Sequence, residues 1–151
     1  MASEKPRIGL AFYIVVGVLL IGGALFGYLQ YTNRPAQEVT LTPEAKVYVR
    51  SLQLSEVTMK ATESYLKQMV VEIDGKIGNK GDRNLEVVEI YCTFYDAYGQ
   101  MVLRKRIPIV STKMGGLKPG ETKSFRLPFD EIPESWNQQM PQLLIAGIKF
   151  S

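Results

Sequence analysis

The chain has 151 residues, of which 46% are hydrophobic and 22% charged, and its formal net charge at pH 7 is +3. That length suits one domain, and the composition is that of globular material with an apolar segment, which excludes a disordered chain. The small net charge gives no argument for nucleic-acid binding, which needs a strong basic excess. The sequence contains no histidine, which removes the commonest general base and the commonest zinc or copper ligand.

Residues 8–29 form a continuous run of 22 residues without a charged side chain. As a helix this run is about 33 Å long, which matches a hydrocarbon core of about 30 Å. Because lipid offers the backbone no hydrogen-bond partner, a lone apolar run crosses it only as a helix. Tyr28 and Tyr31 fall where the helix is expected to meet the headgroups. The run therefore predicts a single, uncleaved membrane span.

A cleaved secretory signal peptide is the competing interpretation of this run. The apolar part of a signal peptide has about 7–15 residues, which is shorter, although residues 22–24 offer a weak small-residue cleavage site. Lys5 and Arg7 precede the run, and only Arg34 closely follows it. By the positive-inside rule, this balance places the N-terminus in the cytoplasm and the domain on the extracytoplasmic side of the cytoplasmic (inner) membrane.

The chain is expected to have four segments. They are a cytoplasmic leader at residues 1–7, a transmembrane helix at 8–29, a tether at 30–43 and a β-sandwich domain at 44–151. Prolines and polar residues make the tether extended. Gly23 and Gly27 form a GxxxG pattern, which lets a second helix approach closely but is also common by chance in glycine-rich spans.

After the tether, apolar residues alternate with polar ones, the period of two that indicates β-strands. The alternating segments are residues 46–50, 69–77, 88–95 and 124–129. Residues 143–150 are apolar on both faces, which predicts a central or covered strand. Turn signals separate these segments, among them the type II pair Pro119-Gly120. The pattern predicts an all-β, antiparallel immunoglobulin-like β-sandwich, with no helix after the membrane span.

Three stretches carry a family likeness: residues 75–83 (GKIGNKGDR), 93–99 (TFYDAYG) and 117–122 (LKPGET). Together they resemble the FxLYD-type domains of prokaryotic envelope proteins. The chain departs from that pattern at Cys92 and Phe94, where the family has Phe and Leu, but both residues are apolar and keep the inward face. The resemblance covers roughly residues 69–150. It implies a small immunoglobulin-like sandwich behind one membrane span or lipid anchor, and it brings no catalytic residues.

Cys92 is the single cysteine, which excludes an internal disulfide. Its place on the apolar face of a predicted strand indicates a buried, unreactive thiol. Residues 104–106, Arg-Lys-Arg, are the dense basic run of the chain. We expect this run to be the exposed end of a strand, with contact to anionic lipid or an acidic partner as the alternative.

No pattern of residues predicts catalytic, cofactor-binding or metal-binding chemistry, so we expect no catalytic residues, no cofactor and no metal. Asp130, Glu131 and Glu134 come nearest to paired carboxylates. They stand beside prolines in a loop, which is typical of solvated surface. They also lack the Asp/Asn/Gly rhythm of a calcium loop.

Aromatic residues supply the candidate contacts with a partner. Trp136 either closes one end of the sandwich or is an exposed anchor, since tryptophan is enriched in interface hot spots. Tyr91 and Tyr95 lie on the polar face of their strand, where they offer either a binding surface or favourable cross-strand pairing. These three residues, with Gly23 and Gly27, are the predicted partner-contact residues.

Two functions are consistent with these observations. The first is a membrane-anchored, non-enzymatic protein-binding or scaffold module of the cell envelope. The alternative is a single-span accessory subunit of a larger membrane protein complex. The expected partners are other membrane or envelope proteins, the lipid bilayer around residues 8–29 and a second copy of the chain through the span; nucleic acid is not expected.

Overall fold

The computed structural model describes residues 9–32 and 38–151. The predicted leader, the charges that orient the span and the middle of the predicted tether lie outside the described residues. The chain forms two compact units, which divide between Gln37 and Glu38. Each unit is described by itself.

The first unit contains helix α1 (Leu10–Thr32), which continues past the predicted end of the span at Leu29. Within Ala11–Thr32 an 18-residue window has a mean hydropathy of 2.2, and none of that window is buried within the chain. At the last turn, the Thr32 hydroxyl donates to the carbonyls of Tyr28 and Leu29, at 3.1 Å each, which satisfies groups that a helix end leaves unpaired. The helix is long and apolar enough to act as a membrane span or a signal anchor.

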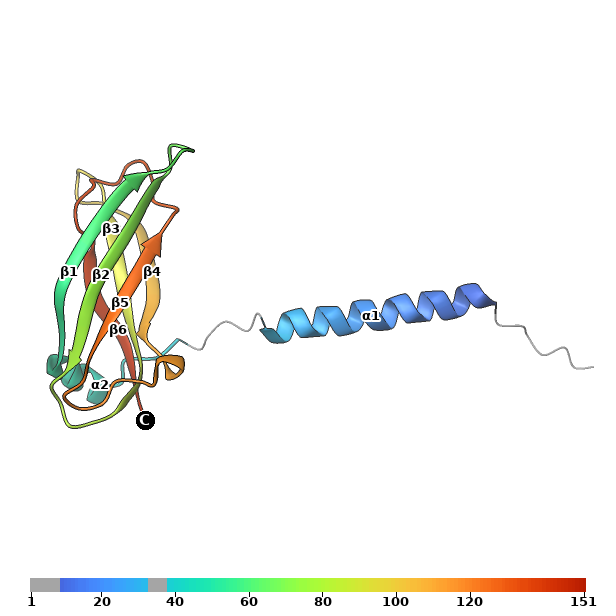
Figure 1. The fold of residues 1–151 in the computed structure, drawn as a ribbon, viewed down its shortest axis with the longest axis horizontal. Coiled ribbons are helices and arrows are strands. Elements are labelled where there is room, and N and C mark those ends of the chain that lie inside the picture. The colour runs from blue at the N-terminus through green and yellow to red at the C-terminus, as the bar shows by residue number, and fades with distance from the viewer. Residues whose placement is uncertain (1–8, 33–37) are drawn as a thin grey trace, which may run out of the picture. The chain divides into compact units, whose positions relative to one another are not determined.

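The second unit is built from six strands in two antiparallel sheets (Figure 1). The strands are β1 (Leu52–Glu63), β2 (Met69–Asn79), β3 (Leu85–Tyr95), β4 (Met101–Val110), β5 (Thr122–Phe129) and β6 (Gln142–Phe150). One sheet has the order β1-β2-β5 and the other has the order β4-β3-β6. The predicted antiparallel, all-β domain after an apolar helix is confirmed at this level.

The alternation of up and down strands gives the domain two distinct ends (Figure 1). The loops that follow β1, β3 and β5 lie together, and we call this the tip end. The opposite end, which we call the base end, carries helix α2 (Pro43–Tyr48), the loop after β2, the β4–β5 connection and the C-terminus. The tip end therefore lies a full strand length away from α2.

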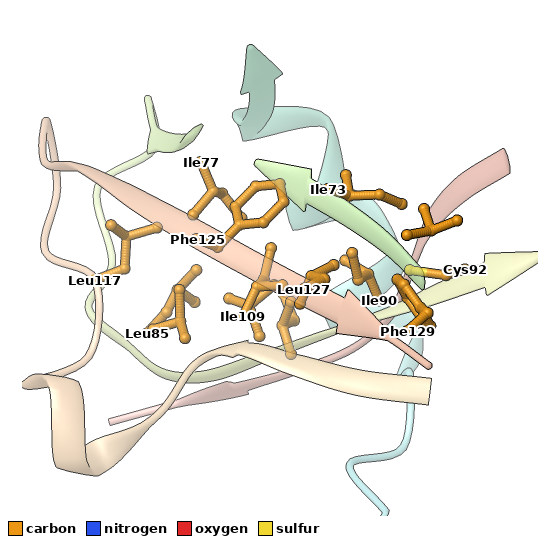
Figure 2. Packing of buried hydrophobic residues seen from close by; sticks show 14 of the residues in the cluster. Ile73, Ile77, Leu85, Ile90, Cys92, Ile109, Leu117, Phe125, Leu127 and Phe129 are labelled. Carbon is orange, nitrogen blue, oxygen red and sulfur yellow. The ribbon is translucent and has the colours of Figure 1, made fainter. Parts of the chain in front are cut away.

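Side chains from the inner faces of both sheets form one hydrophobic core (Figure 2). On β2, Val71, Ile73 and Ile77 are buried and alternate with half-exposed residues, as the period of two predicts. Gly75 interrupts this row because the Phe125 ring of β5 occupies the space of its missing side chain. A Cβ at that position would lie 2.5 Å from Cζ of Phe125, so the glycine permits the two strands to close over the ring.

Strand β6 is an edge strand, so of the two positions predicted from its apolar faces, central or covered, the central one is wrong. Part of its outer face is nevertheless covered, because the backbone of Val39 lies against Gly147. Leu144, further along the same strand, remains half-exposed. The apolar outer face of β6 is therefore covered only in part, by the segment around Val39 through which the chain enters the domain.

The strand predicted at residues 46–50 is wrong, as is the expectation that no helix follows the span. These residues belong to α2 and to the 3₁₀ turn η1 (Val49–Ser51). Thr42 caps α2 by accepting a hydrogen bond from the backbone N–H of Ala45 at 3.2 Å, and Pro43 occupies the first position, where a missing N–H is tolerated. Six residues are too few to display a helical period.

Strand β1 has no counterpart among the predicted segments. A bulge shifts its pairing with β2 between Ser55 and Thr58, and Glu56 has a positive φ of 50°. The β1 side chains packed on the core are Leu52, Leu54, Val57 and Met59, whose spacing of two, three and two breaks the alternation.

Cys92 lies in the core on β3, as predicted, and burial raises the pKa of its thiol to about 12. The folded protein keeps this proton at a pH at which the unfolded thiol, with an ordinary pKa near 9, has lost it. Above pH 9 the unfolded state binds fewer protons, so the contribution of Cys92 to stability falls as the pH rises.

We therefore expect the native thiol to resist a maleimide reagent at pH 8 and to react at once after unfolding in urea. The difference in unfolding free energy between the wild type and Cys92→Ala should fall by about 1.4 kcal/mol between pH 8 and pH 10. Rapid labelling of the native protein would show that Cys92 faces solvent.

Candidate functional site

The predicted partner-contact residues lie in separate places. Gly23 and Gly27 lie on α1, where a side chain added at either position would meet nothing within 4 Å. Tyr91 and Tyr95 lie on the outer face of β3. Trp136 lies in the β5–β6 loop at the tip end and is only 5% exposed. Of these five residues, Tyr95 and Trp136 come close, through the pairing of Asp96 with Trp136.

Tyr91 is enclosed by charged neighbours on the outer face of the β4-β3-β6 sheet. The guanidinium carbon of Arg104 lies 3.8 Å from the centre of its ring, and that of Arg106 lies 5.5 Å away. Arg106 also donates to the Tyr91 hydroxyl at 3.3 Å. Tyr95 donates its hydroxyl hydrogen to Gln142 at 3.0 Å. Both tyrosines therefore make cross-strand contacts within the sheet.

Arg106 also fixes the chain where it enters the domain. Its Nε donates to Oε2 of Glu89 at 2.7 Å, and its guanidinium contacts the carbonyl of Val39. The backbone N–H of Val39 donates to the same carboxylate at 3.3 Å. The Arg106 and Glu89 side chains are only 16% and 10% exposed. Burial alone lowers the pKa of Arg106, but hydrogen bonds to Glu89 and Tyr91 raise it above its ordinary value.

The basic run 104–106 lies in the middle of β4 and not at the end of a strand, so that prediction is wrong. Its three side chains take different environments. Arg104 is exposed beside Tyr91, Lys105 is exposed and lines a small hollow with Phe129, and Arg106 forms the buried pair with Glu89. Strand alternation divides the run, so it does not form one basic patch.

The tip end exposes an aromatic and an aliphatic side chain that sequence reasoning missed. Tyr65 is fully exposed and Leu66 is 80% exposed; we call them the tip pair. They lie in the turn between β1 and β2, which is closed by Ser64 and Gln68 through a backbone hydrogen bond of 2.8 Å. Their signal was a Tyr-Leu pair flanked by polar residues, but this segment lay outside the recognised motifs.

A cleft of about 440 Å³ opens beside the tip pair, between the β1–β2 turn and the β5–β6 loop. Its lining combines apolar and charged side chains. The lining residues are Glu63, Lys67, Gln68, Met69, Ile132, Pro133, Glu134, Trp136 and Gln138. The volume lies within the range of ordinary ligand pockets. A more open hollow of about 650 Å³ lies along the hairpin itself, from Thr62 to Tyr65.

Trp136 forms part of the cleft wall and also packs into the core. Its ring meets Phe94 in an edge-to-face contact with the centroids 5.7 Å apart. Its Nε1 is buried and has no hydrogen-bond acceptor among residues 9–32 and 38–151. Buried indole N–H groups usually have a partner, so Trp136, a lining residue of the cleft, carries a buried donor without a partner in the described part of the chain.

The acidic cluster of the β5–β6 loop is divided by the fold. Asp130 and Glu131 line a small hollow together with Lys105, whereas Glu134 lines the cleft. Within the described part of the chain, no group of three acidic, cysteine or histidine residues is placed to hold a metal ion.

No protein-family model matches this chain, and no curated protein matches it. One solved structure that is similar to it is the crystal structure of the ApaA protein from Bordetella pertussis. The sequence identity is 16% and the TM-score is 0.40; the match covers 66% of this chain and 90% of that protein.

Proposed function

We propose that this protein is a single-pass membrane protein of the cell envelope, which acts by binding another protein and not by catalysis. In this proposal α1 anchors the chain in the cytoplasmic (inner) membrane, and the domain lies on the extracytoplasmic side. The length and hydropathy of α1 support the anchor. The charges at Lys5 and Arg7 support the orientation.

The tip pair is the observation that carries the binding role. Tyr65 and Leu66 lie outside the core of their own domain, on a turn that projects from it. Exposed apolar side chains gathered beside a cleft are typical of interaction sites. Burying one such side chain fully stabilises by about 1.5–3 kcal/mol, so the pair together is large enough to govern the affinity for a partner.

We expect the double variant Tyr65→Ser, Leu66→Ser to lose its partner while it keeps its fold. Full-length tagged protein is solubilised in mild detergent, and the amount of co-purifying protein is measured for the wild type and the variant. Affinity should fall at least tenfold, because about 1.4 kcal/mol corresponds to that factor and the pair can supply more. Stability should change by less than about 0.5 kcal/mol, since both side chains are exposed.

The matched control removes exposed apolar side chains from the base end. Val47 on α2 and Met114 on the β4–β5 connection are exposed, and the double variant Val47→Ser, Met114→Ser should bind the partner as the wild type does. If both double variants bind equally well, the tip end is not the contact surface.

The finer fold assignment also belongs to this proposal: we infer that the domain is immunoglobulin-like and related to the FxLYD-type domains. Two of its three motif stretches, 93–99 and 117–122, form turns that support this relation. Asp96 accepts hydrogen bonds from the backbone N–H groups of Tyr98 and Gln100, at 2.8 Å each, which closes the β3–β4 turn. Gly120 has a φ of 75°, as the third position of a type II turn requires.

An accessory subunit of a larger membrane complex is the second candidate function. It is favoured by the small residues of α1. Gly23 and Gly27 are four residues apart and leave open space where side chains would lie, which lets a neighbouring helix approach closely.

If α1 makes that contact, the double variant Gly23→Leu, Gly27→Leu should lower partner co-purification at least fivefold without changing the stability of the domain. Gly17→Leu is the control, because it lies about 120° around the helix from Gly23. Unchanged co-purification by the double variant would leave α1 as an anchor only.

A further inference from the structure

The cleft at the tip end has an apolar floor, and one of its lining residues carries a buried hydrogen-bond donor that has no partner in the described part of the chain. Met69 comes from β2, while Ile132 and Trp136 come from the β5–β6 loop. Trp136 is 5% exposed, and its Nε1 has no acceptor within the described part of the chain. An apolar pocket with a few placed polar groups is the usual construction of a binding site.

The rim of the cleft carries unpaired carboxylates. Glu63 and Glu134 line it, and neither side chain has an ion-pair or hydrogen-bond partner among residues 9–32 and 38–151. Lys67 is the single basic residue of the lining. Two carboxylates against one ammonium give the rim a net negative charge, which favours a basic group and disfavours an anionic one.

These two features restrict the chemistry of the occupant. The donor at Trp136 requires an acceptor, and the acidic rim disfavours carboxylate or phosphate as that acceptor. A neutral amide carbonyl satisfies both conditions. The apolar floor favours an occupant with an aliphatic side chain next to that carbonyl. The acidic rim favours a basic side chain further along the occupant.

We propose that the cleft binds an extended peptide segment of the partner protein, in which an apolar residue is followed by a basic one. The apolar side chain packs on Met69, Ile132 and Trp136, and the basic side chain lies at Glu63 and Glu134. The backbone carbonyl accepts a hydrogen bond from Nε1 of Trp136, for which the indole tilts towards the cleft. This inference rests on the proposed protein-binding function and names the chemistry of its partner.

The single tryptophan of the chain makes the test direct. Full-length protein labelled with ¹⁵N-tryptophan in dodecyl maltoside gives one indole N–H signal, which belongs to Trp136. The probe is N-acetyl-leucyl-arginine amide, and the matched control probe is N-acetyl-leucyl-glutamate amide. We expect the arginine probe to move the indole proton downfield in a saturable way and the glutamate probe to bind at least fivefold more weakly.

A variant of the rim separates charge recognition from packing. Glu134→Gln should weaken binding of the arginine probe about threefold. It should leave binding of the uncharged N-acetyl-leucyl-glutamine amide unchanged. The same variant should keep the position of the free indole signal, which shows that the fold is intact.

An indole signal that stays in place up to the solubility limit of the arginine probe would overturn the inference. Equal affinity for the arginine and glutamate probes would overturn it as well. The proposed function is tested separately by the tip pair, which lies outside the cleft lining. If the tip-pair variant loses the partner but the indole signal does not move with the arginine probe, the peptide site in the cleft is wrong and the protein-binding function stands. If the arginine probe binds in the cleft but the tip-pair variant keeps its partner, the tip pair is not the contact surface and the peptide site stands.

Discussion

Replacing Asn79 by alanine should lower the unfolding free energy by about 3–5 kcal/mol, although Asn79 is polar and lies at the end of a strand. Its side chain is 1% exposed and serves four groups. The amide nitrogen donates to the carbonyls of Arg83, at 2.8 Å, and Leu117, at 3.3 Å. The amide oxygen accepts from the Tyr48 hydroxyl, at 2.9 Å, and the Gly81 N–H, at 3.0 Å.

The size of this effect follows from what alanine leaves behind. Each buried donor or acceptor that loses its partner costs about 1–3 kcal/mol. Asn79 joins α2, the β2–β3 loop and the β4–β5 connection at the base end, so its loss weakens three elements together. Urea unfolding of the full-length protein in detergent, followed by the fluorescence of Trp136, measures the change.

Asn84→Ala is the matched control for this measurement. Asn84 is exposed and lies in the same loop region, and its backbone carbonyl still accepts from Ser151. The control should change stability by less than about 0.5 kcal/mol. A loss below about 1 kcal/mol for Asn79→Ala would mean that water replaces the amide at the base end.

The second large effect is expected at the buried ion pair of Glu89 and Arg106. Glu89→Ala should cost about 3–5 kcal/mol, because it leaves a guanidinium that is only 16% exposed without its buried carboxylate, and the carboxylate that remains, Glu38 at 3.4 Å, is exposed. The same change removes the acceptor of the Val39 N–H. Hydrogen exchange at the Val39 amide should therefore accelerate. Urea unfolding should separately show the fall in unfolding free energy.

Glu72→Ala is the control for this prediction. Glu72 pairs with Arg126 at 3.7 Å, but Arg126 is 67% exposed, so that pair contributes between about 0 and 1 kcal/mol. The double variant Glu89→Leu, Arg106→Leu should recover most of the lost stability, since no charge then remains buried. If Glu89→Ala costs no more than Glu72→Ala, the pair does not fix the entering segment.

The sequence predicted the core of the fold best where the alternation is regular. Val71, Ile73 and Ile77 follow a strict period of two, and Cys92 and Phe94 do the same, so their inward faces were predictable. The type II turn at Gly120 followed from its Pro-Gly pair. These features depend on local chemistry, which one sequence displays directly.

The parts that were not predictable depend on pairing between distant segments. The bulge near Glu56 breaks the period of two, so the pattern of β1 was not recognised as a strand. Helix α2, which Thr42 caps, has only six residues and is too short to show a helical period. The partner of Arg106 is 17 residues away on another strand. No spacing rule connects the two residues before the register of β3 and β4 is known.

The candidate site was predicted in part. Trp136 was singled out, but its role as the wall of a cleft depends on the β1–β2 turn, which lies about 70 residues earlier. Tyr91 and Tyr95 were named as surface residues, yet each is engaged within its own sheet. The tip pair was missed because a Tyr-Leu pair in a turn has no periodic signal.

The central claim is that the domain contacts its partner through the tip end while α1 stays in the membrane. Site-specific photocrosslinking in intact cells tests it most directly, with a benzoylphenylalanine placed at Leu66 in one strain and at Met114 in another. Both positions are exposed, and they lie at the tip end and the base end respectively. The account predicts one discrete adduct from Leu66 and none from Met114. No adduct from Leu66, or the same adduct from both positions, would contradict it.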